Sequence, residues 1–283
     1  MTAPRPCIIV LVRHAESLAN FTLSQITQGL ATSFPLELAS LRDADVRLTE
    51  LGEAQARATG PYLAERFGIF DHCYVSPWAR TRQTFERLLE GYPDDQRALL
   101  LRRVTYEEQL REHERGALLW VPPAEVAARY PDEAHRRTVE GEYYYRPLGG
   151  ESWADVSQRL AAELGVLYRD HPGGTLLIVA HSTVILCCRK LLQGLGEDEI
   201  MAVRKEGNPR NTSISVFTHA DVGDVGASSA TPANAVADAD VADMPPLNRW
   251  SMDLWDHIAY GPELVSVVPD AHQRLTHPDA RAM

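Results

Sequence analysis

Cys7-Ile-Ile-Val-Leu-Val-Arg-His14 is an apolar run that ends in two basic residues. Isoleucine and valine make up most of it, and their β-branched side chains favour strands. The absence of alternating polar residues is typical of a strand that is covered on both faces, as in a parallel sheet between two layers of helices. The run therefore predicts a central strand whose carboxyl end presents Arg13 and His14.

The chain from this run to His219 alternates between predicted strands and predicted helices. Further strands are predicted over residues 72–75, 98–104, 175–180 and 213–218. Helices are predicted over residues 49–68, 78–89, 152–169 and 183–193. Pro61 predicts a kink or a break in the first helix. This order predicts the α/β class: a three-layer α/β/α sandwich with a mostly parallel central sheet.

Composition divides the chain into three parts. We place the folded domain at residues 1–219, with 21–45 and 114–146 as loop or flap insertions that roof its pocket. Residues 220–246 contain few large apolar side chains, which predicts a flexible linker. Apolar residues in the tail, residues 247–283, predict a short amphipathic helix that docks on the domain or on a partner, which leaves a homo-oligomer open. Removal of residues 220–283 should leave the chemistry intact.

Charge and composition exclude several functional classes. The formal net charge of -11 argues against a nucleic-acid partner. The first apolar run is too short to span a membrane and no cleavage region follows it, so we expect a cytoplasmic protein with no membrane association. The four cysteines lack C-x-x-C spacing and the ten histidines lack H-E-x-x-H spacing, so we expect neither a metal nor another cofactor.

Basic side chains follow three of the predicted strands. Arg13 and His14 end the first strand, Arg80 lies shortly after the second, and His181 follows the strand over residues 175–180. Ligands of open α/β sheets bind outside the carboxyl ends of the strands, so we expect these side chains to converge. A neutral imidazole can attack phosphorus, and arginine forks match phosphoryl oxygens. The convergence predicts a phosphate-handling site.

The string Leu11-Val-Arg-His-Ala-Glu-Ser-Leu-Ala-Asn20 resembles the R-H-G-E-S-x-x-N signature of the histidine phosphatase superfamily, which is also called phosphoglycerate mutase-like. Ala15 stands where the family usually has glycine. Further motifs follow in the family's order, and together they cover about residues 7–217; they include Leu48-Thr49, Gly52, Gln55-Ala56, Ser76-Pro77, Arg80-Thr81, Leu110-Arg-Glu112, Gly149-Gly-Glu-Ser152, Ala180-His-Ser182 and Asn211-Thr-Ser-Ile214.

The resemblance implies a role for each matching position. His14 would become phosphorylated, and the phosphoryl group would be held by Arg13, Arg80 and His181. Glu112 would protonate the leaving oxygen, with Glu108 and Glu114 as alternatives in the same acidic segment. Phosphate binding would be completed by Ser17, Asn20 and Ser182.

The function implied by the resemblance is a metal-independent phosphomonoester hydrolase that acts on a small phosphorylated metabolite through a phosphohistidine. A phosphoglycerate mutase is one alternative, and Arg129, Arg136 or Arg137 would then clamp the substrate. The segment between Glu112 and Gly150 is shorter than in typical mutases, which favours the hydrolase. A catalytically silent phosphate-binding or scaffold protein is the alternative from another class.

Overall fold

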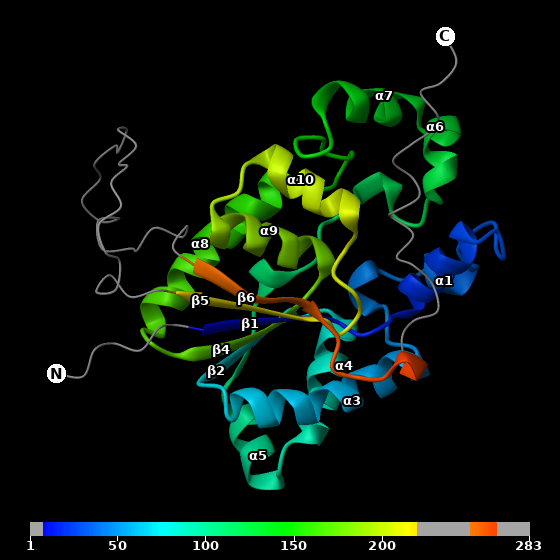
Figure 1. Ribbon diagram of the computed structural model, residues 1–283. Coiled ribbons are helices and arrows are strands. Elements are labelled where there is room, and N and C mark those ends of the chain that lie inside the picture. Colours follow the sequence, from blue (N-terminus) through cyan, green and yellow to red (C-terminus); the bar gives the residue numbers. More distant parts are fainter. Residues whose placement is uncertain (1–7, 220–249, 265–283) are drawn as a thin grey trace, which may run out of the picture.

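A computed structural model describes residues 8–219 and 250–264 of the chain (Figure 1). Within them, strands form one sheet in the order β3-β2-β4-β1-β5-β6. The strands β1 to β4 are mutually parallel where they pair, whereas β5 is antiparallel to both β1 and β6. The mostly parallel sheet is confirmed, and its strands are β1 (Ile8–Arg13), β2 (His72–Val75), β3 (Val104–Tyr106), β4 (Thr175–Ala180), β5 (Ile214–His219) and β6 (Trp250–His257).

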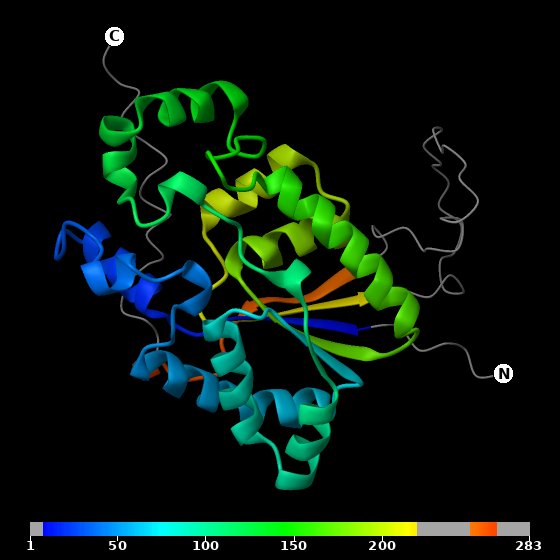
Figure 2. The ribbon, with the colours of Figure 1, turned by 180° about the vertical axis from the view of Figure 1, so that it is seen from behind.

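Helices cover both faces of this sheet, as Figures 1 and 2 show. One layer contains α3 (Glu50–Phe67), α4 (Ala79–Leu88) and α5 (Asp94–Arg102). The other contains α8 (Trp153–Asp170), α9 (Ser182–Gln193) and α10 (Glu197–Glu206). The predicted three-layer architecture is confirmed. No helix in residues 8–219 or 250–264 has the length and apolar character needed to cross a membrane.

Strand β1 is buried on both faces, as its unbroken apolar sequence predicts. Ile9 and Leu11 belong to a core cluster shared with α8 and α9. Val10 and Val12 belong to a second cluster, which is shared with α3 and α4. The alternation of side chains along a strand therefore divides one apolar run between two cores. This packing directs the carboxyl end of β1, and with it His14, toward one edge of the sheet.

One prediction about the first helical layer is wrong in part. Helix α5 takes up residues 98–102 of the strand predicted over residues 98–104, and the strand is confined to Val104–Tyr106. Pro93 precedes this helix, and Asp94 and Asp95 place negative charge at its positive end, which favours a helix start there. Pro61 lies inside α3 without breaking it.

The two roofing segments contain helices of their own. Helix α1 (Leu18–Thr27) begins at a capping box between Ser17 and Asn20. The segment 21–45 contains most of this helix, helix α2 (Leu36–Ala39) and a short 3-10 turn, Asp43–Asp45. The segment 114–146 contains α6 (Val126–Arg129) and α7 (Pro131–Glu140). In Figure 1 these helices lie beyond the carboxyl end of β1.

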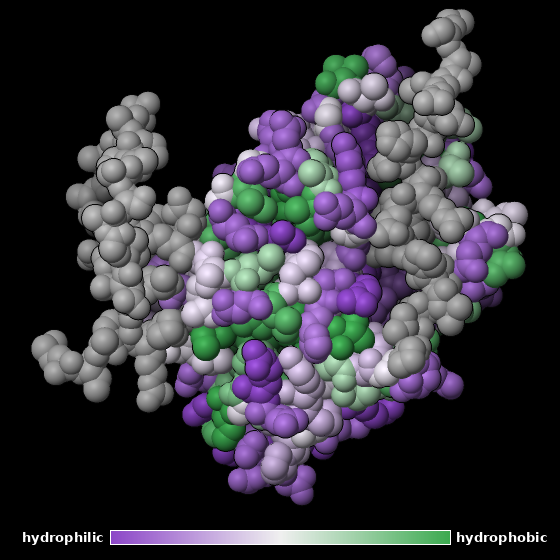
Figure 3. Space-filling view, in the orientation of Figure 1, coloured by the Kyte–Doolittle hydropathy of each residue, from purple (hydrophilic) through white to green (hydrophobic). Residues whose placement is uncertain are grey.

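The amphipathic helix predicted for residues 247–283 is wrong where the structure describes the tail. Residues Trp250–His257 form β6, which pairs with β5 and extends the sheet past residue 219. Met252 and Trp255 pack against the cluster shared with α8 and α9, whereas Leu254 packs against the cluster shared with α3 and α4, and the register between β5 and β6 shifts near Val216. Some apolar surface stays partly exposed along β6 in Figure 3. The linker predicted for residues 220–246 lies outside the described residues.

Trp250 anchors β6 to the domain, and its replacement tests that anchor. Its side chain is 6% exposed and packs edge-on against the rings of Tyr168 and His219. We expect Trp250→Ala to lower the free energy of unfolding by about 3–5 kcal/mol, the range for removing a buried aromatic side chain. Urea denaturation measures the change. Leu148→Ala is the control, because Leu148 is 69% exposed; equal midpoints for both variants would contradict the anchoring role.

Candidate active site

A cavity of about 220 Å³ opens where the carboxyl end of β1 meets the roofing segments. The structure brings most of the predicted site residues to it: its wall includes Arg13, His14, Ser17, Asn20, Arg80, Glu112 and Ser182. Segments that are remote in sequence therefore meet at one edge of the sheet, as the parallel arrangement predicts.

The His14 imidazole has a defined tautomer and is 2% exposed. Its Nδ1 lies 2.7 Å from the carbonyl oxygen of Ala15. A carbonyl oxygen can only accept, so Nδ1 carries the hydrogen and Nε2 keeps a lone pair. Burial, and then the charges of Arg80 and Arg13, hold the pKa of His14 well below its ordinary value. The ring is therefore neutral at neutral pH.

His181 is fully buried beside His14 and lies behind the cavity wall. The two ring centroids are 5.2 Å apart in an edge-on arrangement. His181 Nε2 is 2.8 Å from Ser76 Oγ, whereas its buried Nδ1 has no hydrogen-bond partner among the described residues. Burial and the charge of Arg80 lower the pKa of His181 as well. His181 therefore places a second neutral imidazole beside His14, and the Nδ1 atom of this ring is free to form a hydrogen bond.

Two arginines supply buried positive charge at this end of the cavity, and each is 4% exposed. Arg13 Nη1 donates to the Pro209 carbonyl oxygen at 2.5 Å. Arg80, in the first turn of α4, donates through Nη1 to the backbone oxygen of Asp43 at 2.7 Å and to its carboxylate at 2.9 Å. The Arg80 guanidinium also stacks 4.5 Å from the ring of Trp78. These contacts hold both charges in place.

The loop after His14 is held by groups that the sequence analysis did not single out. Asn211 Nδ2 donates to the His14 carbonyl at 3.0 Å and to Asn20 Oδ1 at 3.3 Å. Tyr260, which follows β6, donates from its hydroxyl to the Asn211 carbonyl at 2.9 Å. Asn211 belongs to one of the motifs shared with the family, so its role could have been found from the sequence. Tyr260 lies in the tail, where no motif marks it.

Ala15 and Glu16 in the same loop are also tied to neighbouring helices. The Ala15 amide donates to Thr84 Oγ1 at 3.0 Å, and Ala15 is not among the described residues with positive φ, so its methyl group causes no backbone strain. The Glu16 amide donates to Gln55 Oε1 at 3.0 Å, and Gln55 Nε2 donates to the Leu264 carbonyl at 2.9 Å. The C-terminal segment therefore supports the loop from a second side.

Among the three acidic candidates, Glu112 alone lines the cavity. Its Oε1 accepts from the His113 amide at 2.9 Å, and Ser182 Oγ donates to its Oε2 at 3.4 Å. Glu114 instead pairs with Arg111 at 3.3 Å and is 49% exposed. Glu108 lies in a 3-10 turn away from the cavity wall. Of these three candidates, the geometry therefore favours Glu112.

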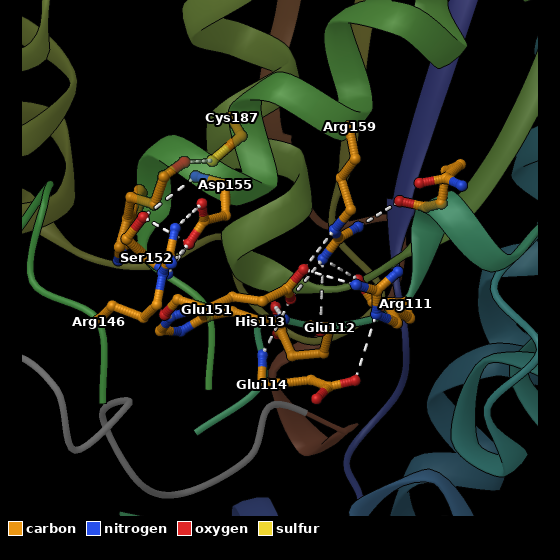
Figure 4. A network of polar contacts seen from close by, with 12 residues as sticks. Arg111, Glu112, His113, Glu114, Arg146, Glu151, Ser152, Asp155, Arg159 and Cys187 are labelled. Atoms are coloured by element: carbon orange, nitrogen blue, oxygen red, sulfur yellow. Dashed lines mark hydrogen bonds and ion pairs between the residues drawn. The ribbon is translucent and has the colours of Figure 1, made fainter. Parts of the chain in front are cut away.

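Arg159 of α8 braces the segment that carries Glu112 (Figure 4). Its Nη2 donates to the Arg111 carbonyl at 2.9 Å, and its Nε donates to Glu151 Oε1 at 3.0 Å. Arg111 donates to the same Glu151 oxygen at 2.6 Å. The sequence analysis missed Arg159, because one arginine on a helix has no distinguishing pattern. This network fixes the loop without using the Glu112 carboxylate.

The described residues contain no group of three or more histidine, cysteine, aspartate or glutamate side chains that is arranged to hold a metal ion. The cysteines among them, Cys73, Cys187 and Cys188, are buried and free, and burial raises the pKa of each thiol. These thiols are therefore protonated and form part of the core rather than the site.

Comparison with curated proteins gives relatives of two kinds. Mouse ubiquitin-associated and SH3 domain-containing protein B is 29% identical over 186 residues, an alignment that covers 61% of this chain and 28% of the mouse protein. A second relative is a 2,3-bisphosphoglycerate-dependent phosphoglycerate mutase from Methylobacterium radiotolerans, which is 30% identical over 195 residues. This alignment covers 68% of this chain and 82% of the mutase.

Solved structures share the fold. A mycobacterial glucosyl-3-phosphoglycerate phosphatase superposes with a TM-score of 0.63 at 22% identity, covering 89% of this chain and 99% of the other. A putative alpha-ribazole-5'-P phosphatase from Escherichia coli has a TM-score of 0.61 at 16% identity, covering 90% and 98%. The family model of the histidine phosphatase superfamily (branch 1) matches residues 9–226. This chain therefore belongs to the histidine phosphatase superfamily.

Proposed function

We propose that this protein is a phosphomonoester hydrolase that forms a phosphohistidine on His14 without a metal ion and acts on a small phosphorylated metabolite. The observation that carries the proposal is the neutral His14 ring, whose Nε2 keeps its lone pair beside two buried guanidinium groups. Arg13 and Arg80 supply the charge that a metal ion provides in other phosphatases.

The first step transfers the phosphoryl group to the protein. His14 Nε2 attacks phosphorus, the bond from phosphorus to the ester oxygen breaks, and Glu112 protonates the departing alcohol. Arg13 and Arg80 neutralise the phosphoryl oxygens, with Arg80 exchanging its contact to the Asp43 carboxylate for the substrate. His181, whose buried Nδ1 has no hydrogen-bond partner among the described residues, lies beside His14 at this end.

The second step returns His14 to its starting state. Water attacks phosphorus while the Glu112 carboxylate accepts a proton from it, and the bond from phosphorus to Nε2 breaks. Inorganic phosphate leaves, and Glu112 is again protonated for the next substrate. Division into two displacements lets one carboxyl group act first as the acid and then as the base.

Replacement of His14 tests the proposal directly. We expect His14→Ala to reduce kcat on an aryl phosphate by at least about 10³-fold, because the attacking atom is removed. Rapid quenching of the unaltered protein should trap an acid-labile phosphohistidine that the variant lacks. His135→Ala is the matched control, since His135 is exposed on α7. Equal turnover by all three proteins would refute the proposal, and absence of turnover with retained phosphate binding would support the silent phosphate-binding alternative.

A phosphoglycerate mutase is the second candidate, and the Methylobacterium relative is the observation that favours it. A mutase would convert 3-phosphoglycerate into its 2-phospho isomer in the presence of 2,3-bisphosphoglycerate. We expect release of inorganic phosphate instead, because the segment from Glu112 to Gly150 that roofs the site is short. Phosphorus NMR of the products measures both outcomes in one sample, and isomer without free phosphate would favour the mutase.

The pH dependence of activity should reflect the neutral state of His14. Its pKa lies below the ordinary value of 6.5, so the reactive neutral ring persists as the pH falls through that value. We expect the acidic limb of kcat/KM, corrected for ionisation of the substrate, to lie below pH 6.5. A profile with an aryl phosphate measures it. A limb at or above the ordinary value would show that His14 is not held neutral.

Tyr260 should act as a positioning residue through Asn211. Tyr260→Phe removes the hydroxyl that donates to the Asn211 carbonyl, and Asn211 holds the loop after His14. We expect kcat/KM to fall about fivefold, the worth of one neutral hydrogen bond, with an unchanged pH profile. Tyr106→Phe is the control, because Tyr106 is exposed on β3. Identical kinetics for the two variants would contradict a positioning role of the C-terminal segment.

A further inference from the structure

The Glu112 carboxyl group belongs to a segment that secondary structure does not hold in place. Residues 111–115 lie between two 3-10 turns and form neither helix nor strand. Within the described part of the chain, the carboxylate accepts from the His113 amide at 2.9 Å and from Ser182 Oγ at 3.4 Å. A general acid must come within about 2.6–3.2 Å of the oxygen that it protonates. Contacts from elsewhere in the fold must therefore set the position of this segment.

Arg159 of helix α8 holds the backbone that leads into Glu112. Its Nη1 donates to the Gln109 carbonyl. Its Nη2 donates to the carbonyl oxygens of Arg111 at 2.9 Å and of Glu112 at 3.4 Å. A guanidinium is planar and its donors have fixed directions. One side chain therefore fixes three carbonyl oxygens of the segment at once.

Glu151 holds the two residues that follow Glu112. Its carbonyl oxygen accepts from His113 Nε2 at 2.5 Å, and its Oε2 accepts from the Glu114 amide at 3.2 Å. The Glu151 amide donates in turn to the Glu114 carbonyl at 2.9 Å. Gly150 permits this close approach, because a Cβ atom there would lie 2.5 Å from the Glu114 carbonyl oxygen.

An ion pair joins these two supports, and Figure 4 shows it beside the segment that carries Glu112. Arg159 donates to Glu151 through Nε at 3.0 Å and through Nη2 at 3.1 Å. The two side chains are only 9% and 13% exposed. A two-pronged pair that is largely shielded from water is both strong and geometrically specific. The Arg159–Glu151 pair therefore holds the chain on both sides of Glu112 and leaves its carboxylate available for proton transfer.

On the basis of the proposed function, we propose that Arg159 and Glu151 are positioning residues for the proton transfer by Glu112. Neither residue lines the cavity, so both act through Glu112 and not on the substrate. A displacement of about 1 Å at a reacting group can cost about 10²-fold in rate. The pair therefore determines how much help the protein gives to an alcohol that leaves poorly without a proton.

Arg159 also acts on the site through its charge. Burial is the main cause of the lowered pKa of His181, and the positive charge of Arg159 is a smaller cause, after that of Arg80. Arg159→Lys keeps this charge but loses the planar fork that serves several acceptors at once. The variant therefore separates positioning from electrostatics.

The leaving group distinguishes proton transfer from other contributions to the rate. p-Nitrophenol is acidic enough to leave with little protonation, whereas phenol depends more on the acid. In the proposed mechanism kcat/KM reports the transfer to His14, so we compare kcat/KM for p-nitrophenyl phosphate with that for phenyl phosphate. We expect Arg159→Lys and Glu151→Gln each to raise this ratio at least about tenfold. A loss of folded protein would lower both values equally and leave the ratio unchanged.

Two further variants calibrate the ratio. Glu112→Gln removes the acid itself and should raise the ratio about 10²-fold, and Arg159→Lys in that background should add no further change. Arg169→Lys is the control on the same helix, because Arg169 is exposed and pairs with Asp170 at 3.1 Å. This control should leave the ratio unchanged.

The possible results separate the positioning role from the function on which it rests. A raised ratio in Glu112→Gln with unchanged ratios in Arg159→Lys and Glu151→Gln would overturn the positioning role alone. An unchanged ratio in Glu112→Gln, or no turnover by the unaltered protein, would refute the proposed function and the positioning role with it. Arg159→Lys and Glu151→Gln alter opposite partners of one ion pair, so either suffices if the other fails to fold.

Discussion

The site depends on the buried imidazole of His14, which is held beside the permanent positive charges of Arg13 and Arg80. Burial, Arg80 and Arg13 all disfavour a proton on His14 Nε2, and the Ala15 carbonyl holds the remaining hydrogen on Nδ1. The ring therefore presents a lone pair at a pH where an exposed histidine would be partly protonated. In the proposed mechanism, the charges that keep the ring neutral are also those that pair with the phosphoryl group, so activation of His14 and binding of the substrate have one physical cause.

The sheet topology explains how distant segments support this ring. Because β5 runs antiparallel to β1, Ile214 at its start pairs with Val12 at the end of β1, and Asn211 lies beside His14. β6 runs antiparallel to β5, so its carboxyl end returns to the same edge and delivers Tyr260. An edge strand that looks peripheral in Figure 1 is thereby coupled to the loop that follows His14.

The roofing segments distribute charge over the cavity. Asp43 from the segment 21–45 forms an ion pair with Arg80, and its negative charge also acts to raise the pKa of Arg115. The segment 114–146 supplies Arg115 and Arg137, and α10 supplies Arg204, to the wall of the same cavity. In the proposed mechanism the constant part of the site, at the strand ends, performs the chemistry, and the roof selects the substrate.

The sequence by itself determined the central strand, the layered fold and the convergence of His14, Arg13, Arg80 and His181, because continuous burial and the ends of parallel strands leave local patterns. It did not determine whether residues 94–102 or 250–257 form helix or strand, since short apolar runs fit both periods and the pairing partner decides. The family resemblance pointed to Glu112 and left Glu108 and Glu114 open, and tertiary structure placed only Glu112 of these three in the cavity wall. Tertiary structure also brought Tyr260, Arg115 and Arg204 to the site, because these placements arise from loop paths and long-range packing that no local periodicity encodes.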